Sequence, residues 1–215
     1  MKIVLAGGGD ASDSRLLDGV FAGWLGSGGR MLYWPIALRG IRPYSSCLEW
    51  IKATFSPLGV TRITMWTDLS EHRAGELDRF DGIYIGGGNT YALLAQIQES
   101  GFWSVLGDYA KSGKPIYGGS AGAILLGRDI RSANHFDRKI ADLKDTRGLD
   151  LAGGHTIWPH YQPHDDDLIN AYIRECQQTV LAIPERSGIA IDEAGMQKAG
   201  FEPAYLFELQ DKEEI

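Results

Sequence analysis

Residues 115–126 read PIYGGSAGAILL, a short β-prone run that passes through glycines into an apolar, helix-prone stretch. Within it, residues 118–122 fit G-x-S-x-G, the pattern of a nucleophile elbow between a strand and a helix. A serine on such a strained turn needs small neighbours, because a side chain beside it would clash with the strand or the helix. The N–H groups that open the helix would face a developing oxyanion. The same residues also fit a plain βα turn in which Ser120 only caps the helix.

Length and composition indicate one globular domain over residues 1–215. Hydrophobic residues make up 44% of the chain, enough for a substantial core. No apolar run approaches the roughly 20 residues of a membrane span, and the N-terminal MKIVLAGGGD has too short an apolar stretch for a signal peptide. The net charge of −7 and the lack of a Lys/Arg stripe argue against a nucleic-acid surface.

The two cysteines predict a reducing compartment. Cys47 and Cys176 are widely separated and have no metal-ligand partners near them in the sequence. This usage suits the cytoplasm better than an oxidising compartment. We therefore expect a cytoplasmic protein.

Strand-like apolar runs alternate with segments that have helical spacing of apolar residues. The predicted strands are Ile3–Ala6, Arg30–Pro35, Thr61–Met65, Gly82–Ile85, Pro115–Tyr117, Thr179–Ile183 and Gly188–Ile191. The predicted helices are Asp13–Gly26, Tyr44–Ser56, Leu69–Arg79, Thr90–Ser100 and Gly101–Ser112. This alternation predicts an α/β fold, with a mostly parallel sheet flanked by helices on both faces. Sites in such sheets form at the carboxyl ends of the strands.

A second glycine-rich segment, residues 86–90 (GGGNT), follows a predicted strand. Its glycines let the backbone approach a ligand, and Asn89 or Thr90 can cap the next helix. The segment therefore fits an oxyanion hole or substrate-binding loop beside Ser120, a plain βα turn, or a phosphate loop. No Gly-Lys-Ser/Thr follows, and G-x-G-x-x-G is not satisfied, so neither common nucleotide-binding motif is present.

A serine nucleophile needs a base, and His160 is the histidine best placed to act as one. It ends the β-prone stretch 156–159, where site residues collect. His160, His164 and an aspartate of residues 165–167 also resemble a two-histidine, one-carboxylate metal set. However, Pro163 prevents the two histidines from sharing a regular helix, and acids are expected where a helix begins. We expect no metal.

The third group required is a carboxylate that orients the imidazole. Glu185 lies just past an apolar strand, again at a carboxyl end. Asp192 and Glu193 follow the next predicted strand and are the competitors. Chain order does not decide between them, because triads occur in several orders.

Taken together, these motifs resemble the peptidase E family of serine peptidases, also called the aspartyl dipeptidase or S51 family, which includes the cyanophycinases. The matching segments are GGGNT at 86–90, GSAGA at 119–123, PHY at 159–161 and IPE at 183–185. The resemblance implies a class I glutamine amidotransferase-like, flavodoxin-like sandwich. It also implies that Ser120 is the nucleophile, His160 the base and Glu185 its orienting group. The N–H groups of Gly88 and Ala121 would form the oxyanion hole.

The sequence departs from the aspartate-specific members of that family, in which an arginine a short way past the histidine pairs with the acidic substrate. Here His160 is followed by YQPHDDDL, and the first arginine is Arg174. We therefore expect no strict need for an N-terminal aspartate. Asn89, His164 and Trp158 are predicted to contact substrate. A distant arginine, Arg131 or Arg138, would be the first candidate if an acidic residue were preferred.

The function predicted is that of a serine exopeptidase, similar to a dipeptidase, that hydrolyses short peptides through an acyl-enzyme without a cofactor. One alternative is an α/β-hydrolase esterase, whose acid would lie between serine and histidine; Asp137, Asp142, Asp145 and Asp150 fall there. Another is a non-catalytic binding module on the same scaffold. The apolar run 204–209 predicts either an edge strand of the chain's own sheet or a contact in a homodimer.

Overall fold

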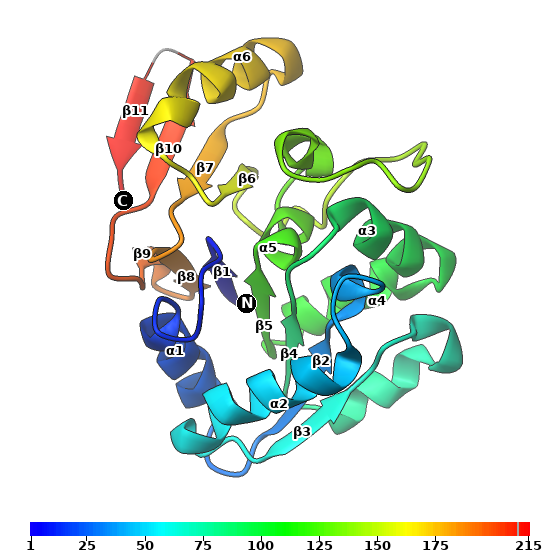
Figure 1. The fold of residues 1–215 in the computed structure, drawn as a ribbon. Helices are drawn as coiled ribbons and strands as arrows, with labels where there is room; N and C mark the ends of the chain where they lie inside the picture. The colour runs from blue at the N-terminus through cyan, green and yellow to red at the C-terminus, as the bar shows by residue number, and fades with distance from the viewer. Residues whose placement is uncertain (210) are drawn as a thin grey trace.

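A seven-stranded sheet forms the centre of the computed structural model, which describes residues 1–209 and 211–215. Its strand order is β3-β2-β4-β5-β1-β8-β9 (Figure 1). The strands are β1 (Lys2–Ala6), β2 (Arg30–Trp34), β3 (Arg62–Met65), β4 (Gly82–Ile85), β5 (Pro115–Gly119), β8 (Gly188–Asp192) and β9 (Gly195–Lys198). The first five run parallel, β8 pairs antiparallel with β1, and β9 pairs antiparallel with β8.

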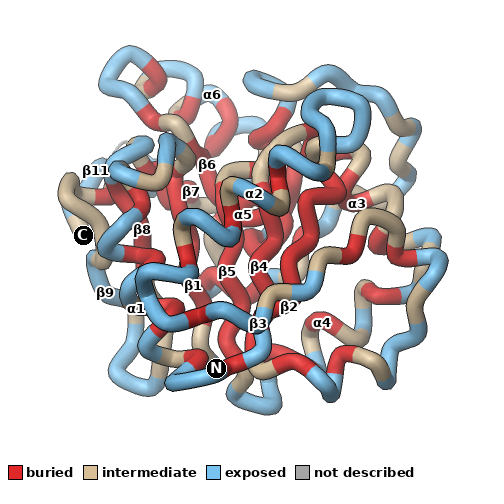
Figure 2. The backbone as a smooth tube through the Cα atoms, turned by 60° about the horizontal axis from the view of Figure 1, so that its bottom comes forward, coloured by how far each residue is buried: buried red, intermediate tan, exposed pale blue. Residues whose placement is uncertain are grey.

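Helices cover both faces of this sheet because its strands are apolar on both sides. Val4, Met31 and Tyr117 pack with helices α1 (Arg15–Leu25) and α2 (Tyr44–Phe55). Their strand neighbours, among them Ile3 and Leu32, face the opposite core. That core is completed by α3 (Thr90–Glu99), α4 (Phe102–Lys111) and α5 (Ala121–Leu126). Figure 2 shows the middle strands β1, β4 and β5 in the buried interior. The predicted fold class is confirmed.

A second sheet, which the sequence did not predict as a separate unit, has the order β11-β10-β7-β6. Its strands are β6 (Thr156–Pro159), β7 (Val180–Ile183), β10 (Tyr205–Glu208) and β11 (Asp211–Glu214). Helix α6 (Asp166–Cys176) packs on it around Trp158, Tyr172 and Phe207. The prediction that residues 204–209 form an edge strand is wrong, because β10 lies between β7 and β11. The alternative, a contact in a homodimer, stays a prediction. The outer strand β11 is instead charged and exposed, which discourages further strand pairing.

The predicted helix Leu69–Arg79 is also wrong. The structure has two short 3₁₀ helices there, η3 (Leu69–Glu71) and η4 (Ala74–Arg79). They are separated by His72 and Arg73, whose backbones are extended. The ring of His72 stacks on Trp66 with centroids 3.8 Å apart, and the N–H of Arg73 donates to Glu76, so a new helix begins there.

Short 3₁₀ turns also connect several other elements. They are η1 (Ile36–Leu38), η2 (Ser56–Leu58), η5 (Ile130–His135) and η6 (Pro163–Asp165). Among the residues described, no helix is long and apolar enough to cross a membrane.

Candidate active site

Ser120 stands at a tight turn between the end of β5 and the start of α5. Its φ is 47° and its ψ is −106°, a conformation that costs a non-glycine residue on the order of 1–3 kcal/mol. The turn leaves no room for side chains. A Cβ on Gly122 would lie 2.3 Å from the carbonyl oxygen of Ile85, and one on Gly118 would lie 2.7 Å from the nitrogen of Ala123. The packing of β4 and α5 thus imposes the glycines of G-x-S-x-G.

His160 follows β6 and reaches Ser120 from the second sheet. Its Nε2 lies 2.8 Å from Oγ of Ser120, and its Nδ1 lies 3.0 Å from Oε1 of Glu185. Because a carboxylate only accepts hydrogen bonds, Nδ1 carries the proton and donates to Glu185. Nε2 is then free to accept the hydroxyl proton of Ser120. The structure therefore joins the three residues that the sequence selected into one hydrogen-bonded chain.

The loop after β1 is joined by backbone hydrogen bonds to the segments that follow β6 and β7. The N–H of His160 donates to the carbonyl of Gly7, and the N–H of Gly7 donates to the carbonyl of Ser187. Gly8 has a φ of 128°, and a Cβ there would lie 2.2 Å from Cε1 of His160. A glycine is therefore required beside the imidazole.

Three of the competing carboxylates form contacts elsewhere. Oδ1 of Asp192 accepts from the N–H of Ala194 in the β8–β9 turn. Asp137 accepts from the N–H of Thr90, and Asp145 pairs with Arg147. Among the described residues, the carboxylate bonded to His160 is that of Glu185.

Two N–H groups near Ser120 suit an oxyanion. The N–H of Ala121 opens α5, and that of Gly88 lies in the loop between β4 and α3; neither donates a hydrogen bond to any part of the chain that the structure describes. Gly88 has a φ of 126°, and a Cβ there would lie 2.2 Å from the carbonyl oxygen of Ala37. Asn89 instead has a structural role: its side chain caps α3 and donates to the carbonyl of Arg138.

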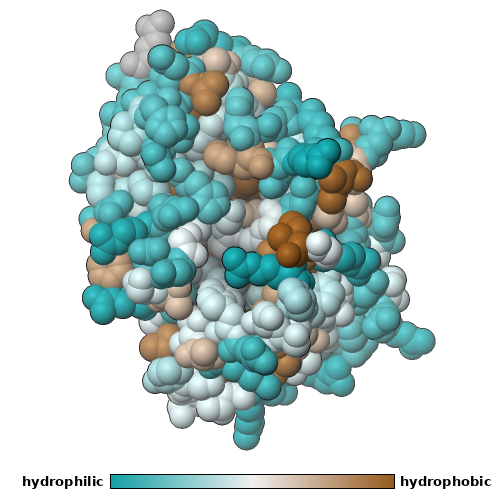
Figure 3. All heavy atoms as spheres, in the orientation of Figure 1, coloured by the Kyte–Doolittle hydropathy of each residue, from teal (hydrophilic) through white to brown (hydrophobic). Residues whose placement is uncertain are grey.

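A cavity of about 560 Å³ opens beside Ser120 and His160. Its walls come from the β1–α1 loop, the η1–α2 segment and the glycines 86–88, and Tyr33, Tyr84 and Tyr117 also line it. In Figure 3 the molecule is hollowed near the centre of the face shown, with hydrophilic and hydrophobic residues around the hollow. A cavity of this size is in the range of small-molecule sites.

None of the three residues expected to contact substrate lines this cavity: Asn89 caps α3, and the other two lie away from it. Trp158 is completely buried in the core of the second sheet, against the rings of His135 and Tyr172. His164 is largely exposed, and its Nε2 lies 3.5 Å from Asp165. Neither lines the cavity. The alternation of β6 does not expose Trp158, because α6 and η5 cover this strand.

The arginine that lines this cavity is one that the sequence analysis missed. Arg131 pairs with Asp129 and lines a separate, smaller cavity, and Arg138 is exposed on a surface loop. Arg42 lines the cavity that contains Ser120. Its segment follows the carboxyl end of β2, so the rule that sites form at strand ends could have identified it.

Comparisons with known proteins show what this chain is similar to. Residues 3–199 match the sequence profile of Peptidase family S51. Peptidase E of Shewanella baltica (strain OS185) is 31% identical over 137 residues, covering 59% of this chain and 56% of that protein. Peptidase E of Escherichia coli O1:K1 / APEC is 28% identical over 165 residues, covering 72% and 70%. The match thus spans little more than half the length of the Shewanella relative.

Two solved structures share the fold. A candidate peptidase E protein from Listeria monocytogenes EGD-e has a TM-score of 0.74 at 20% identity, covering 94% of this chain and 98% of that chain. A peptidase from an acI-B1 Actinobacterium also has a TM-score of 0.74, at 16% identity, covering 100% and 93%. At these identities the likeness establishes a common architecture, that of the class I glutamine amidotransferase-like proteins.

Proposed function

The chain belongs to peptidase family S51, and on this premise we propose that it is a serine exopeptidase, similar to a dipeptidase, that hydrolyses short peptides. The observation that carries the proposal is the chain of hydrogen bonds from Ser120 through His160 to Glu185. A strained serine, an acceptor nitrogen and an orienting carboxylate are the three groups that acyl transfer requires.

In the proposed mechanism, His160 takes the proton of Ser120 as Oγ attacks the scissile carbonyl. The N–H groups of Gly88 and Ala121 stabilise the oxyanion, each contributing about 3–4 kcal/mol to the transition state. His160 then gives its proton to the leaving amine, which departs and leaves an acyl-enzyme. Nε2 of His160 then takes a proton from water, which attacks the acyl carbon. The bond to Oγ of Ser120 breaks, the acid product leaves, and His160 returns the proton to Oγ. Glu185 holds the ring orientation throughout.

Three further observations support other parts of the proposal. The cavity of about 560 Å³ suits a small peptide. An N-terminal aspartate is not strictly required, because the segment after His160 brings no arginine to the cavity. In that segment His164 faces solvent and Asp166 pairs with Lys212. Cys47 and Cys176 are both free thiols, consistent with a cytoplasmic location.

Labelling with a serine-reactive phosphonate tests the nucleophile. The wild-type protein should be labelled on Ser120, and Ser120→Ala should not react. Ser45→Ala is a matched control, since Ser45 is exposed at the start of α2 and should leave labelling unchanged. Labelling that survives Ser120→Ala would remove the basis of the proposal.

A dipeptide panel tests the selectivity. The first residue is varied at a fixed second residue near pH 7.5, and neutral and basic residues should be accepted. A preference for Asp-X above about a hundredfold in kcat/KM, roughly 2.7 kcal/mol, would contradict this part of the proposal.

A further inference from the structure

The cavity beside Ser120 contains a cation that the proposed mechanism does not use. Of the described residues that line it, Arg42 is the one lysine or arginine. Its guanidinium makes no ion pair or hydrogen bond with the part of the chain that the structure describes. The neighbouring Arg39 contrasts with it, because Arg39 pairs with Asp68 at 2.8 Å and lies outside the cavity wall.

The backbone fixes Arg42 in this position. Its N–H donates to the carbonyl of Leu38 at 3.1 Å, and Pro43 follows it at the cap of α2 with a φ of −60°. A proline next in sequence restricts the backbone of Arg42 as well. The guanidinium is thus carried on a constrained turn.

The charge of Arg42 acts on the cavity itself. Burial raises the pKa of Tyr33 and that of Cys47, and the positive charge of Arg42 opposes this rise at both groups. Tyr33 and Cys47 both line the cavity, so its electrostatic potential contains the contribution of Arg42. This contribution is positive, so the charge of Arg42 itself attracts an anion that comes near its guanidinium.

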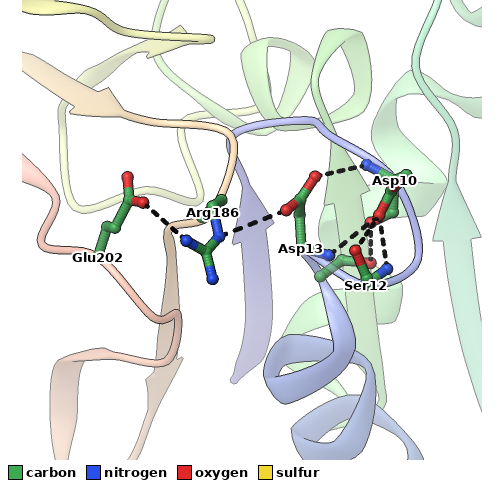
Figure 4. A network of polar contacts seen from close by, with 6 residues as sticks. Asp10, Ser12, Asp13, Arg186 and Glu202 are labelled. Atoms are coloured by element: carbon green, nitrogen blue, oxygen red, sulfur yellow. Dashed lines mark hydrogen bonds and ion pairs between the residues drawn. The ribbon is translucent and has the colours of Figure 1, made fainter.

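The one carboxylate on the described cavity wall does not neutralise Arg42. Asp10 lies in the β1–α1 loop, where its Oδ1 accepts from the N–H and the hydroxyl of Ser12 and from the N–H of Asp13 (Figure 4). The carboxylate of Asp13 in turn accepts from the N–H of Asp10 and pairs with Arg186. Asp10 is therefore held by its own loop, and the pairing capacity of Arg42 is left for a ligand.

We propose that Arg42 is a specificity-determining residue that binds a carboxylate of the peptide substrate. This inference rests on the proposed function, which places a peptide in the cavity. A guanidinium can bind a carboxylate through two parallel N–H···O bonds, so it selects both charge and orientation. The carboxylate has two possible sources, the C-terminus of a short peptide or an acidic side chain.

Binding to Ser120→Ala tests the inference without any requirement for turnover. Calorimetry compares two matched ligand pairs: Ala-Leu against its C-terminal amide, and Asp-Leu against Asn-Leu. Each pair differs in one charge at nearly constant shape. The same ligands are measured with Arg42→Gln, Arg42→Lys and the matched control Arg39→Gln, each added to Ser120→Ala.

In one pair, Ser120→Ala should bind the carboxylate ligand at least about tenfold more tightly, which corresponds to about 1.4 kcal/mol. Arg42→Gln should bring that ratio close to one, Arg42→Lys should retain part of it, and Arg39→Gln should leave it unchanged. The pair in which the ratio collapses identifies the source of the carboxylate.

Three results would each overturn the inference. The affinity ratio could be the same in Ser120→Ala and in Arg42→Gln, neither pair could show a preference for the carboxylate ligand, or Arg39→Gln could reduce the ratio as much as Arg42→Gln. Failure of phosphonate labelling together with a ratio that depends on Arg42 would refute the proposed catalysis and leave the binding site standing. The two proposals therefore fail separately.

Discussion

Ser120 and Glu185 lie at the two ends of one hydrogen-bonded chain, yet their surroundings differ in almost every physical respect. Ser120 is held by a turn in which the neighbouring glycines touch the backbones of β4 and α5. Glu185 follows β7 of the second sheet, and 57% of its side chain is exposed. The nucleophile is therefore positioned by close packing, whereas the orienting carboxylate is positioned by a solvated loop.

This comparison predicts how each half responds to substitution. Close packing fails abruptly when one atom is added, because the backbone that it meets cannot move without displacing a strand. A solvated carboxylate interacts weakly, because water screens its charge and replaces its hydrogen bonds. Substitutions should therefore have their largest effects on the Ser120 side and their smallest at Glu185.

The largest effect is expected from Gly122→Ala. The new Cβ would lie 2.3 Å from the carbonyl oxygen of Ile85, so α5 must move away from β4 and displace Ser120. We expect kcat/KM to fall by about a thousandfold and the free energy of unfolding to drop by about 1–3 kcal/mol. Peptide hydrolysis and urea unfolding measure the two effects.

Gly107→Ala is the matched control, because a Cβ on this α4 glycine meets nothing within 4 Å. It should keep full activity and gain up to about 1 kcal/mol of stability from the better helix propensity of alanine. Full activity in Gly122→Ala would show that close packing does not position the serine.

The next effect is expected from Gly8→Ala, which tests the contact between the two halves. The added Cβ would lie 2.2 Å from the imidazole of His160, but this ring is 35% exposed and can turn away. We expect the fold to persist and kcat/KM to fall by about a hundredfold, because the base is misplaced. Steady-state hydrolysis, with circular dichroism to confirm folding, checks this.

Gly26→Ala is the matched control for Gly8→Ala, because it introduces backbone strain without a clash against a neighbouring side chain. Gly26 also has a positive φ, 73°, but a Cβ there meets nothing within 4 Å. It should lose stability by about 1 kcal/mol and keep its activity. If both variants lost activity equally, the contact with His160 would not be the cause.

The same contrast explains what the sequence could predict. Apolar strands, amphipathic helices and the elbow are local sequence patterns. Ser120, His160 and Glu185 each follow a strand, so their places in the fold could be predicted from the sequence. The second sheet was not, because Asp211–Glu214 has no apolar pattern and becomes a strand only by pairing with β10. The burial of Trp158 likewise depends on η5 and α6, which pack on β6 from distant parts of the chain.

Arg42 shows a further limit of sequence analysis. It lies far before Ser120 in the chain, in a segment with three arginines and lysines of similar appearance, Arg39, Arg42 and Lys52. What distinguishes it is its place in the cavity wall together with the lack of a partner within the described residues, and both properties depend on how the fold places Arg42, Asp68 and Asp10. Ion pairs between residues that are distant in the chain cannot be predicted from the local spacing of residue types.

A third prediction concerns a buried charge on the Ser120 side. Asp18 of α1 is 1% exposed, accepts a hydrogen bond from the hydroxyl of Ser14, and has a pKa raised by burial to about 6 from 3.8. The folded state therefore holds a proton that the unfolded state has released between these two values. The contribution of Asp18 to the free energy of unfolding is fully present below about pH 4. It is lost as the pH rises through about 6, and the total loss is about 2–3 kcal/mol.

Asp18→Asn should remove this slope. At pH 7.5 the variant should unfold at higher urea than the wild type, and near pH 4 the difference should vanish or reverse. Urea unfolding at several pH values between 4 and 7.5 provides the measurement, with Asp108→Asn as an exposed control on α4. An unchanged slope in Asp18→Asn would mean that Asp18 is not the group responsible.

The smallest effect is expected at the exposed end of the triad. Glu185→Gln keeps the shape of the side chain and a hydrogen-bond acceptor for Nδ1 of His160, and removes the charge that stabilises the imidazolium. Because more than half of the side chain is exposed, water already screens that charge. We expect kcat to fall by about tenfold with KM nearly unchanged, since the imidazolium forms only along the reaction path.

Asp192→Asn is the matched variant, because Oδ1 of Asp192 accepts from the N–H of Ala194 rather than from His160, and its kcat should be unchanged. If Asp192→Asn were crippling and Glu185→Gln silent, the orienting role would pass to Asp192. If Glu185→Gln were as damaging as Gly122→Ala, exposure would not weaken this half of the site, and the contrast between its two ends would be wrong.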